Sequence, residues 1–191
     1  MIFESQYWKD DLRKIGARIL KRKGQTRWIA RSFVALEKDV FVGFYAIRKL
    51  VEAKKLSVTI ETMQIDVTTY SSTEKGVTRL NSHRLDEHYD FTSPSQGQVP
   101  ILLMCNQVIH SYIFTGYFND DYTLGGIFVT SDHSRKQKLY AVEVDALIML
   151  FETVATDDPV EMHSIFDPSI GDYGVTLHST YQRHRDHEAD K

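Results

Sequence analysis

The chain has 191 residues, of which 42% are apolar and 26% charged, and its formal net charge is −3 at pH 7. A chain of this length and composition buries enough surface to fold as a globular domain without a metal or disulfide staple, which excludes a disordered or fibrous protein. The single cysteine excludes an intramolecular disulfide, and we find neither a signal-peptide pattern nor a run of about 18 apolar residues, so we expect a cytoplasmic protein with no membrane association.

The charge is unevenly distributed along the chain. Residues 9–31 contain nine Lys or Arg against Asp10 and Asp11, a balance of +7, so the remainder carries −10. Within this stretch Lys14, Arg18 and Arg22 recur at four-residue intervals and predict one basic helix face. We interpret that face as a candidate RNA-binding surface, and a solvated helix face remains the alternative.

Two helices are predicted at the start of the chain. Over residues 5–23 apolar side chains recur at helical spacing, with Ser5 as a candidate N-cap and Gly24 as the stop. A second and longer helical pattern covers residues 26–56, in which Gly43 costs about 1 kcal/mol relative to alanine. The short connection between the two predicts an antiparallel helical hairpin.

The middle of the chain changes character. Residues 58–70 are rich in β-branched side chains and alternate near their end, which predicts a strand. Residues 72–91 are polar and predict a loop with a short helical turn near Asn81 or Ser82. The segment "TSPSQGQ" (92–98) reads as a turn-rich linker.

The second half alternates between helices and strands. We predict a helix over 99–114 beginning at Pro100, a β-hairpin over 112–131 that turns at 119–121, and a strand over 139–144. Asp145 is the expected cap of a last helix over 146–155, and residues 167–174 are typical of a turn.

The predicted fold class is therefore α+β and helix-dominated: an antiparallel helical hairpin and a motif helix, with a β-hairpin and extra strands as an elaboration. We expect a single domain over 1–177 followed by a polar, flexible tail over 178–191.

The segment "CNQVIHSY" (105–112) places two polar side chains in an apolar run, "ILLMCNQVIHSYIF". Asn106 and His110 lie four residues apart and therefore share one face of a helix. One interpretation is a buried, hydrogen-bonded pair that fixes the register of the helix. The other is a functional histidine at the mouth of a cleft with Asn106 orienting it.

The same segment resembles the signature helix of the HEPN superfamily, helical-bundle domains found among bacterial toxins and abortive-infection RNases. Asn106, His110 and Tyr112 match its pattern, and the helix containing "FVGFYAIRKLVEAKKLS" (41–57) resembles the helix that partners the motif in such proteins. The resemblance implies a metal-independent endoribonuclease in a toxin–antitoxin or phage-defence setting. It also implies RNA as the substrate, a homodimer formed through the motif helix, and a cognate partner protein.

Cys105 occupies the position at which the family has an arginine. RNA cleavage needs a base for the 2′-hydroxyl and a cation for the charge on phosphorus, and a cysteine cannot replace a guanidinium. The cation would then come from Arg79 or Arg84 in the polar loop, from Arg48 on the long helix, or from a second subunit. Arg84 is our first candidate, because the segment 83–90 immediately precedes the motif helix and could fold over His110.

The segment "HRLDEHYD" (83–90) contains His83 and His88 five residues apart, a poor spacing for metal ligands on one helix face. We interpret it as a solvated loop, and we predict neither a metal site nor a cofactor.

Two functions remain open. The first is a HEPN-like protein that cleaves or binds RNA through His110, Asn106 and Arg84. The second is a non-enzymatic interaction or structural protein with a buried Asn106–His110 pair. If His110 opens into a cleft with Arg84 or Arg48 nearby, the first is favoured, whereas a His110 sealed by aromatic side chains excludes catalysis.

Overall fold

A computed structural model of the chain describes residues 2–73, 75–169 and 171–179. These residues form a mixed α+β structure, as predicted. The elements in chain order are α1 (Ser5–Lys23), α2 (Ala30–Glu52), α3 (Val58–Glu61), β1 (Gln64–Ser71), α4 (Leu85–His88), β2 (Ser95–Pro100), α5 (Ile101–Ile109), β3 (Ser111–Phe118), β4 (Leu124–Ser131), β5 (Lys138–Glu143), α6 (Val144–Thr156), β6 (Pro159–Asp167) and β7 (Asp172–Ser179).

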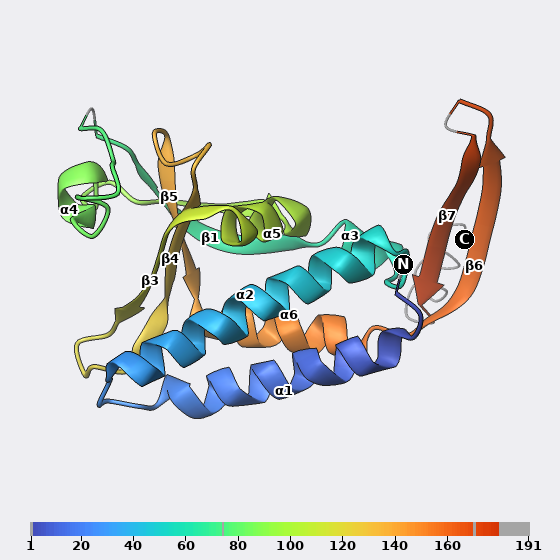
Figure 1. Ribbon diagram of the computed structural model, residues 1–191, viewed down its shortest axis with the longest axis horizontal. Coiled ribbons are helices and arrows are strands. Elements are labelled where there is room, and N and C mark those ends of the chain that lie inside the picture. The colour runs from blue at the N-terminus through green and yellow to red at the C-terminus, as the bar shows by residue number, and fades with distance from the viewer. Residues whose placement is uncertain (1, 74, 170, 180–191) are drawn as a thin grey trace, which may run out of the picture.

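Five strands form one antiparallel sheet in the order β2-β1-β5-β4-β3. Figure 1 shows helices α1, α2, α5 and α6 gathered on one side of this sheet, while α4 lies on the other. We call these two sides the helical face and the outer face.

The main core lies between the helices and the helical face of the sheet. Alternate residues of the strands point into it, among them Ile65 and Val67 of β1. From the helices, Phe44 and Phe151 meet edge to face with ring centroids 5.6 Å apart, and both are fully buried. This core fixes how α2 and α5 lie against each other.

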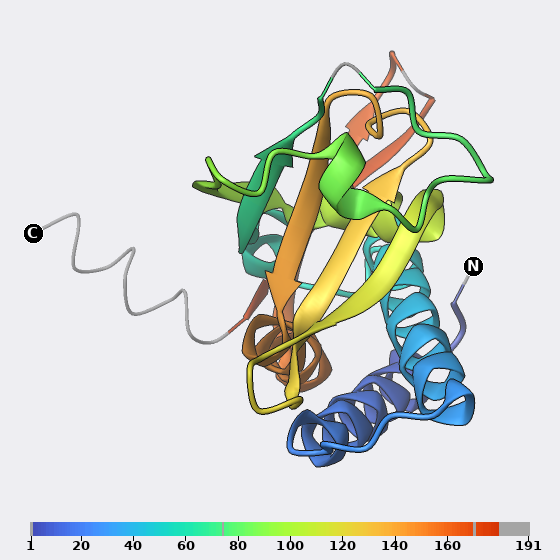
Figure 2. The ribbon, with the colours of Figure 1, turned by 90° about the vertical axis from the view of Figure 1, so that its left-hand side faces the viewer.

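A smaller core covers part of the outer face. Val77, Tyr89, Ile113 and Leu139 are its buried members. Figure 2 shows the segment with α4 crossing this face of the sheet. The loop between β1 and β2 is therefore anchored on the side of the sheet opposite α5.

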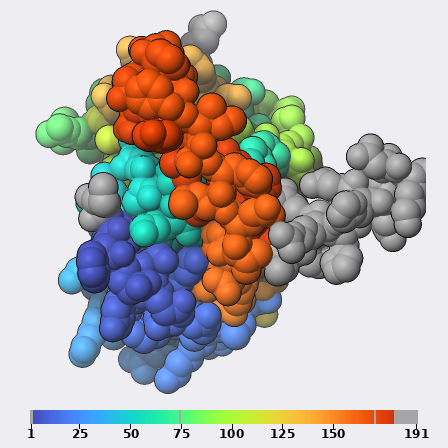
Figure 3. Space-filling model, turned by 90° about the vertical axis from the view of Figure 1, so that its right-hand side faces the viewer, coloured from blue at the N-terminus to red at the C-terminus, as the bar shows by residue number. Residues whose placement is uncertain are grey.

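Strands β6 and β7 form a separate two-stranded hairpin, where residues 167–174 were predicted only as a turn. The hairpin contacts α3 through β7 and lies at the surface in Figure 3. Its apolar side chains are more than half exposed at Val160, Met162, Ile165, Phe166 and Tyr173.

The predicted helical hairpin is present, with small corrections at its ends. The first helix has the predicted bounds and ends at Gly24, but Glu4 rather than Ser5 is the N-cap, accepting a hydrogen bond from the backbone N–H of Gln6. The second helix is shorter than predicted and spans Ala30–Glu52.

Several other predicted boundaries of strands and helices were wrong, in part because pairing between strands decides them. Residues 95–100 form strand β2 rather than a linker, because they pair with β1 from Gln64↔Pro100 to Thr69↔Ser95. The strand predicted over 58–70 is split into α3 and β1. Asp145 does not cap α6, whose N-cap is Glu143.

The predicted motif helix is also too long: α5 ends at Ile109, and Ser111 begins β3, so Tyr112 lies on a strand. The predicted hairpin over 112–131 is present as β3 and β4. Of the predicted tail, His178 and Ser179 belong to β7, and 180–191 lie outside the described residues.

Candidate functional site

A cleft of about 890 Å³ opens between α5, the outer surface of α2 and the loop that joins β4 to β5. Polar and charged side chains make up most of its lining. Among them are Arg48, Asn106, His110, Asp132, His133 and Lys138. Both side chains of the predicted Asn–His pair therefore face the cleft.

Helix α5 divides its residues between the core and this cleft. Met104, Cys105 and Val108 are fully buried against the other helices and the sheet, whereas Asn106 and His110 are exposed. The prediction of a buried Asn106–His110 pair is therefore wrong. The two residues are linked through the backbone, because the N–H of His110 donates to the carbonyl oxygen of Asn106 at 3.1 Å.

His110 is the C-cap of α5, the first residue beyond the helix. The chain turns there because the following residues pair with β4, beginning with Ser111↔Ser131. His110 is thus the single residue between the end of α5 and the start of β3. The junction thus leaves the imidazole exposed at the edge of the cleft.

Arg48 of α2 places a positive charge in direct contact with the motif. Its Nη1 donates to Oδ1 of Asn106 at 2.5 Å, and its Nε donates to Oε1 of Glu52 at 2.8 Å. A guanidinium thus reaches the cleft from the neighbouring helix, although position 105 lacks one. Arg48 was one of the sources of positive charge that the sequence left open.

Glu52 balances part of this charge. Its pKa is lowered by the hydrogen bond from Lys49 and then by that from Arg48, so the carboxylate is ionised at neutral pH. An anion that enters the cleft must therefore compete with Glu52 for the guanidinium.

Cys105 itself takes no part in the cleft. It is fully buried, and burial raises the pKa of its thiol to about 12. The thiol is therefore protonated at neutral pH and is no nucleophile.

Arg84 does not lie in the cleft. It is the N-cap of α4, on the outer face of the sheet, and its Nη1 pairs with Glu87 at 3.4 Å. The expectation that segment 83–90 folds over His110 is wrong, since the sheet separates α4 from α5. Within the same segment His88 is buried, with its ring nitrogens 3.3 and 3.1 Å from the carbonyl oxygens of Lys75 and Asn81.

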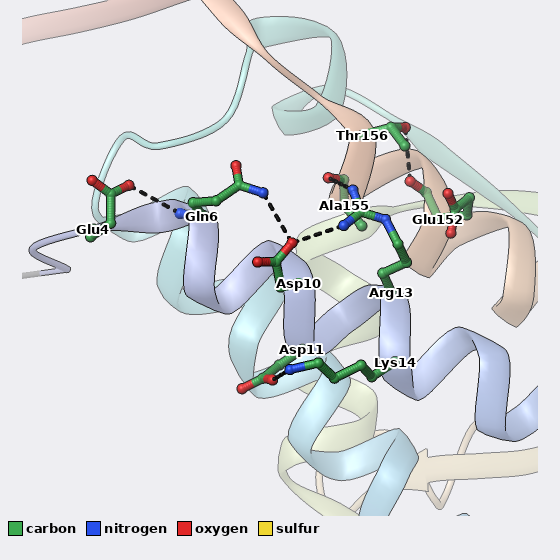
Figure 4. A network of polar contacts seen from close by, with 9 residues as sticks. All are labelled: Glu4, Gln6, Asp10, Asp11, Arg13, Lys14, Glu152, Ala155 and Thr156. Atoms are coloured by element: carbon green, nitrogen blue, oxygen red, sulfur yellow. Dashed lines mark hydrogen bonds and ion pairs between the residues drawn. The ribbon is translucent and has the colours of Figure 1, made fainter.

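The three residues of the predicted basic face are occupied by carboxylates. Arg18 and Arg22 both bind the buried Asp39 of α2, each at 2.6 Å. Lys14 pairs with Asp11 at 3.0 Å within α1, as Figure 4 shows. None of the three lines the cleft. The hydrogen bonds to Asp39 join the two helices.

Sequence reasoning missed the residues that the β4–β5 loop and β5 bring to the cleft, among them His133 and Lys138. Both follow β4 in the chain. No local pattern identifies them, because they approach α5 only through the pairing of β3 with β4.

Comparison of the chain with protein-family models, with curated proteins and with solved structures finds no match. Within residues 2–73, 75–169 and 171–179, no group of three or more His, Cys, Asp or Glu side chains is arranged to hold a metal ion. No helix in the same residues is long and apolar enough to cross a membrane.

Proposed function

We propose that the cleft binds RNA and cleaves its backbone in a metal-independent reaction, with His110 as the general base and Arg48 as the cation. The observation that carries the proposal is the hydrogen bond from Arg48 to Asn106, which brings a guanidinium into the same cleft as the exposed His110. Asn106 thereby acts as a positioning residue for Arg48. The HEPN-like identity, with its toxin–antitoxin or phage-defence setting and cognate partner, belongs to this proposal and rests on the motif alone.

The chemistry assigns one task to each group. His110 takes the proton of the 2′-hydroxyl while the 2′-oxygen forms a bond to phosphorus and the bond from phosphorus to the 5′-oxygen breaks. Arg48 stabilises the negative charge that builds up on the non-bridging oxygens, for which a forked donor is well suited. Lys138 adds a second positive charge to the same cleft and favours entry of a polyanion.

The test is cleavage of a fluorescent RNA by the purified protein in EDTA. We expect His110→Ala to lower the rate by about 10²–10⁴-fold and Arg48→Ala by about 10²–10³-fold, with Arg48→Lys intermediate because an ammonium lacks the fork. Arg84→Ala is the matched control, since it removes an exposed arginine on the outer face. Thermal melting establishes that each variant is folded.

Full activity of a folded His110→Ala variant would refute the assignment of the base. Absence of both cleavage and RNA binding in the unaltered protein would refute the function as a whole.

A second candidate function is RNA binding without cleavage, and Glu52 favours it. Its carboxylate holds Arg48 by a hydrogen bond of 2.8 Å and weakens the cation that the reaction would need. Glu52→Gln removes this charge, so we expect it to raise RNA affinity at low salt in either case. Cleavage that stays undetectable in Glu52→Gln while binding increases would select the binding function.

A further inference from the structure

The loop between β4 and β5 brings a second imidazole to the cleft. His133 lies 23 residues after His110 in the sequence, yet both line the same cavity and both are exposed. The backbone N–H of Asp132 donates to the carbonyl oxygen of His110 at 3.2 Å. The residue next to His133 is therefore tied directly to the residue that we propose as the base.

A buried polar network holds this loop against α5. Gln107 is 6% exposed, and its side chain binds the loop on either side of His133, at Ser131 and Ser134. Its Oε1 accepts from the N–H of Ser131 at 2.9 Å, and its Nε2 donates to Oγ of Ser134 at 3.1 Å. The N–H of Ser134 in turn donates to Oγ of Ser131 at 3.2 Å.

This network has a consequence for His133. A buried amide whose hydrogen bonds are satisfied specifies one arrangement of the groups around it, because any other arrangement leaves polar atoms unpaired. The loop is therefore fixed relative to the motif helix on both sides of His133. Gln107 follows Asn106 directly, so two adjacent residues of α5 position the two other contributors to the cleft, Arg48 and His133.

We propose that His133 is the general acid of the same reaction, a role that rests on the proposed function. In the step His110 accepts the 2′-hydroxyl proton as the bond from the 2′-oxygen to phosphorus forms. His133 donates a proton to the 5′-oxygen as the bond from that oxygen to phosphorus breaks. The products are a 2′,3′-cyclic phosphate and a 5′-hydroxyl, and both imidazoles return to their starting states by proton exchange with water.

The substrate class follows from this division of work. A base that must find a 2′-hydroxyl and an acid that must reach the 5′-oxygen together require a ribose at the scissile position. DNA, which lacks the 2′-hydroxyl, is therefore a ligand at most. The charged groups around the two imidazoles are Arg48 of α2, Asp132 of the loop and Lys138 of β5.

The test separates the acid from the base by changing the leaving group. An oligonucleotide is prepared with one free 2′-hydroxyl, all others being methylated, and with either oxygen or sulfur as the 5′-bridging atom after it. A thiolate leaves without a proton, so the sulfur substrate does not need an acid. We expect His133→Ala to cleave the oxygen substrate about 10²–10⁴-fold more slowly but the sulfur substrate at nearly the rate of the unaltered protein. His110→Ala should slow both.

The pH profile provides a second readout that a merely structural role would not change. With two imidazoles acting as base and acid, the unaltered protein should show a bell-shaped profile, and His133→Ala should lose the decline on its alkaline side. His83→Ala, which removes an exposed histidine outside the cleft, is the matched control.

The outcomes distinguish this inference from the function on which it rests. If His133→Ala cleaves both substrates normally, or slows both equally, His133 is not the acid while His110 and Arg48 keep their roles. If the unaltered protein cleaves neither substrate, the proposed function fails and the acid role fails with it.

Discussion

Position 105 illustrates how the surroundings of one residue decide which chemistry it can carry. The side chain of Cys105 lies fully inside the core of this protein, so an arginine there would have to bring its charge into the core. Arg48 approaches from α2 and keeps about a third of its side chain exposed. In the proposed reaction, the cation is therefore a side chain that stays in contact with water and with Glu52.

Burial of Cys105 leads to a prediction about the reactivity of its thiol. Because burial raises its pKa to about 12, we expect no reaction with a disulfide reagent at pH 8 until the protein unfolds. Labelling in the native state and in urea, followed by absorbance, measures this. Rapid labelling of the native protein would contradict the buried position.

The raised pKa of Cys105 also makes the stability of the protein depend on pH. The folded-state pKa lies above the value of 9.0 for an unshifted thiol, so unfolding favours loss of the proton. The contribution of Cys105 is therefore complete below about pH 9 and declines as the pH rises toward 12. The free energy of unfolding, measured in urea, should therefore fall more steeply over this pH range for the unaltered protein than for Cys105→Ala.

At the scale of elements, local patterns predicted the helices that pack along their full length. The bounds of α1 follow from apolar spacing and from Gly24 directly after its last residue, because both signals are local in the sequence. The end of α5 could not be predicted in this way, since residues 108–114 remain apolar whether they are helix or strand. Pairing of β3 with β4 decides it, and that pairing is what exposes His110.

Strand β2 and the hairpin of β6 and β7 were missed for the same reason. The segment 95–100 is polar and carries Gly97 and Pro100, which disfavour a strand on propensity alone. It becomes a strand because the edge of β1 offers a row of hydrogen-bonding partners. The Asn106–His110 face was thus predictable from spacing, whereas the contributions of Arg48 and His133 to the cleft depend on contacts between distant segments.

Helix packing yields a prediction from two glycines. A Cβ on Gly43 of α2 would lie 2.7 Å from ring atoms of the fully buried Phe151, whereas one on Gly16 of α1 would meet only ordinary contacts from 3.7 Å. We expect Gly43→Ala to destabilise the protein by about 1–3 kcal/mol through overpacking. Gly16→Ala should instead stabilise it by up to about 1 kcal/mol through helix propensity.

Thermal or urea unfolding of the two variants decides between packing and propensity. The sequence alone assigned Gly43 only a cost of propensity, which would make its replacement by alanine favourable. Equal stabilisation by both substitutions would mean that α2 and α6 do not approach as closely as the position of Phe151 requires.

At the scale of the whole molecule, the charge pattern of the sequence is rearranged by folding. Asp39 of α2 pairs with Arg18 and Arg22, and Asp145 of α6 binds Lys23 at 2.7 Å, so these two carboxylates offset part of the positive charge of α1. The cleft contains Arg48, Lys138 and Asp132 together with two imidazoles. Electrostatic attraction for a polyanion is therefore expected at the cleft as well as along α1.

The last prediction concerns whether a second copy of the chain is needed. The motif resemblance predicts a dimer through the motif helix, and the apolar residues of that helix suggested its interface. In the structure most of those residues face the protomer's own core. The one large apolar side chain of α5 that is exposed is Leu102, at 38%. The groups proposed for the reaction, His110, Arg48 and His133, all come from one chain.

We therefore expect the cleavage rate per chain to stay constant on dilution, measured alongside the molar mass by light scattering. Leu102→Arg places a charge at the centre of any interface through α5 without entering the core, so it should leave the rate unchanged. A rate that falls on dilution as a dimer dissociates, together with a similar loss in Leu102→Arg, would show that the cleft is completed by a partner subunit. In that case a group from the second copy would be needed to act beside Arg48 during the reaction.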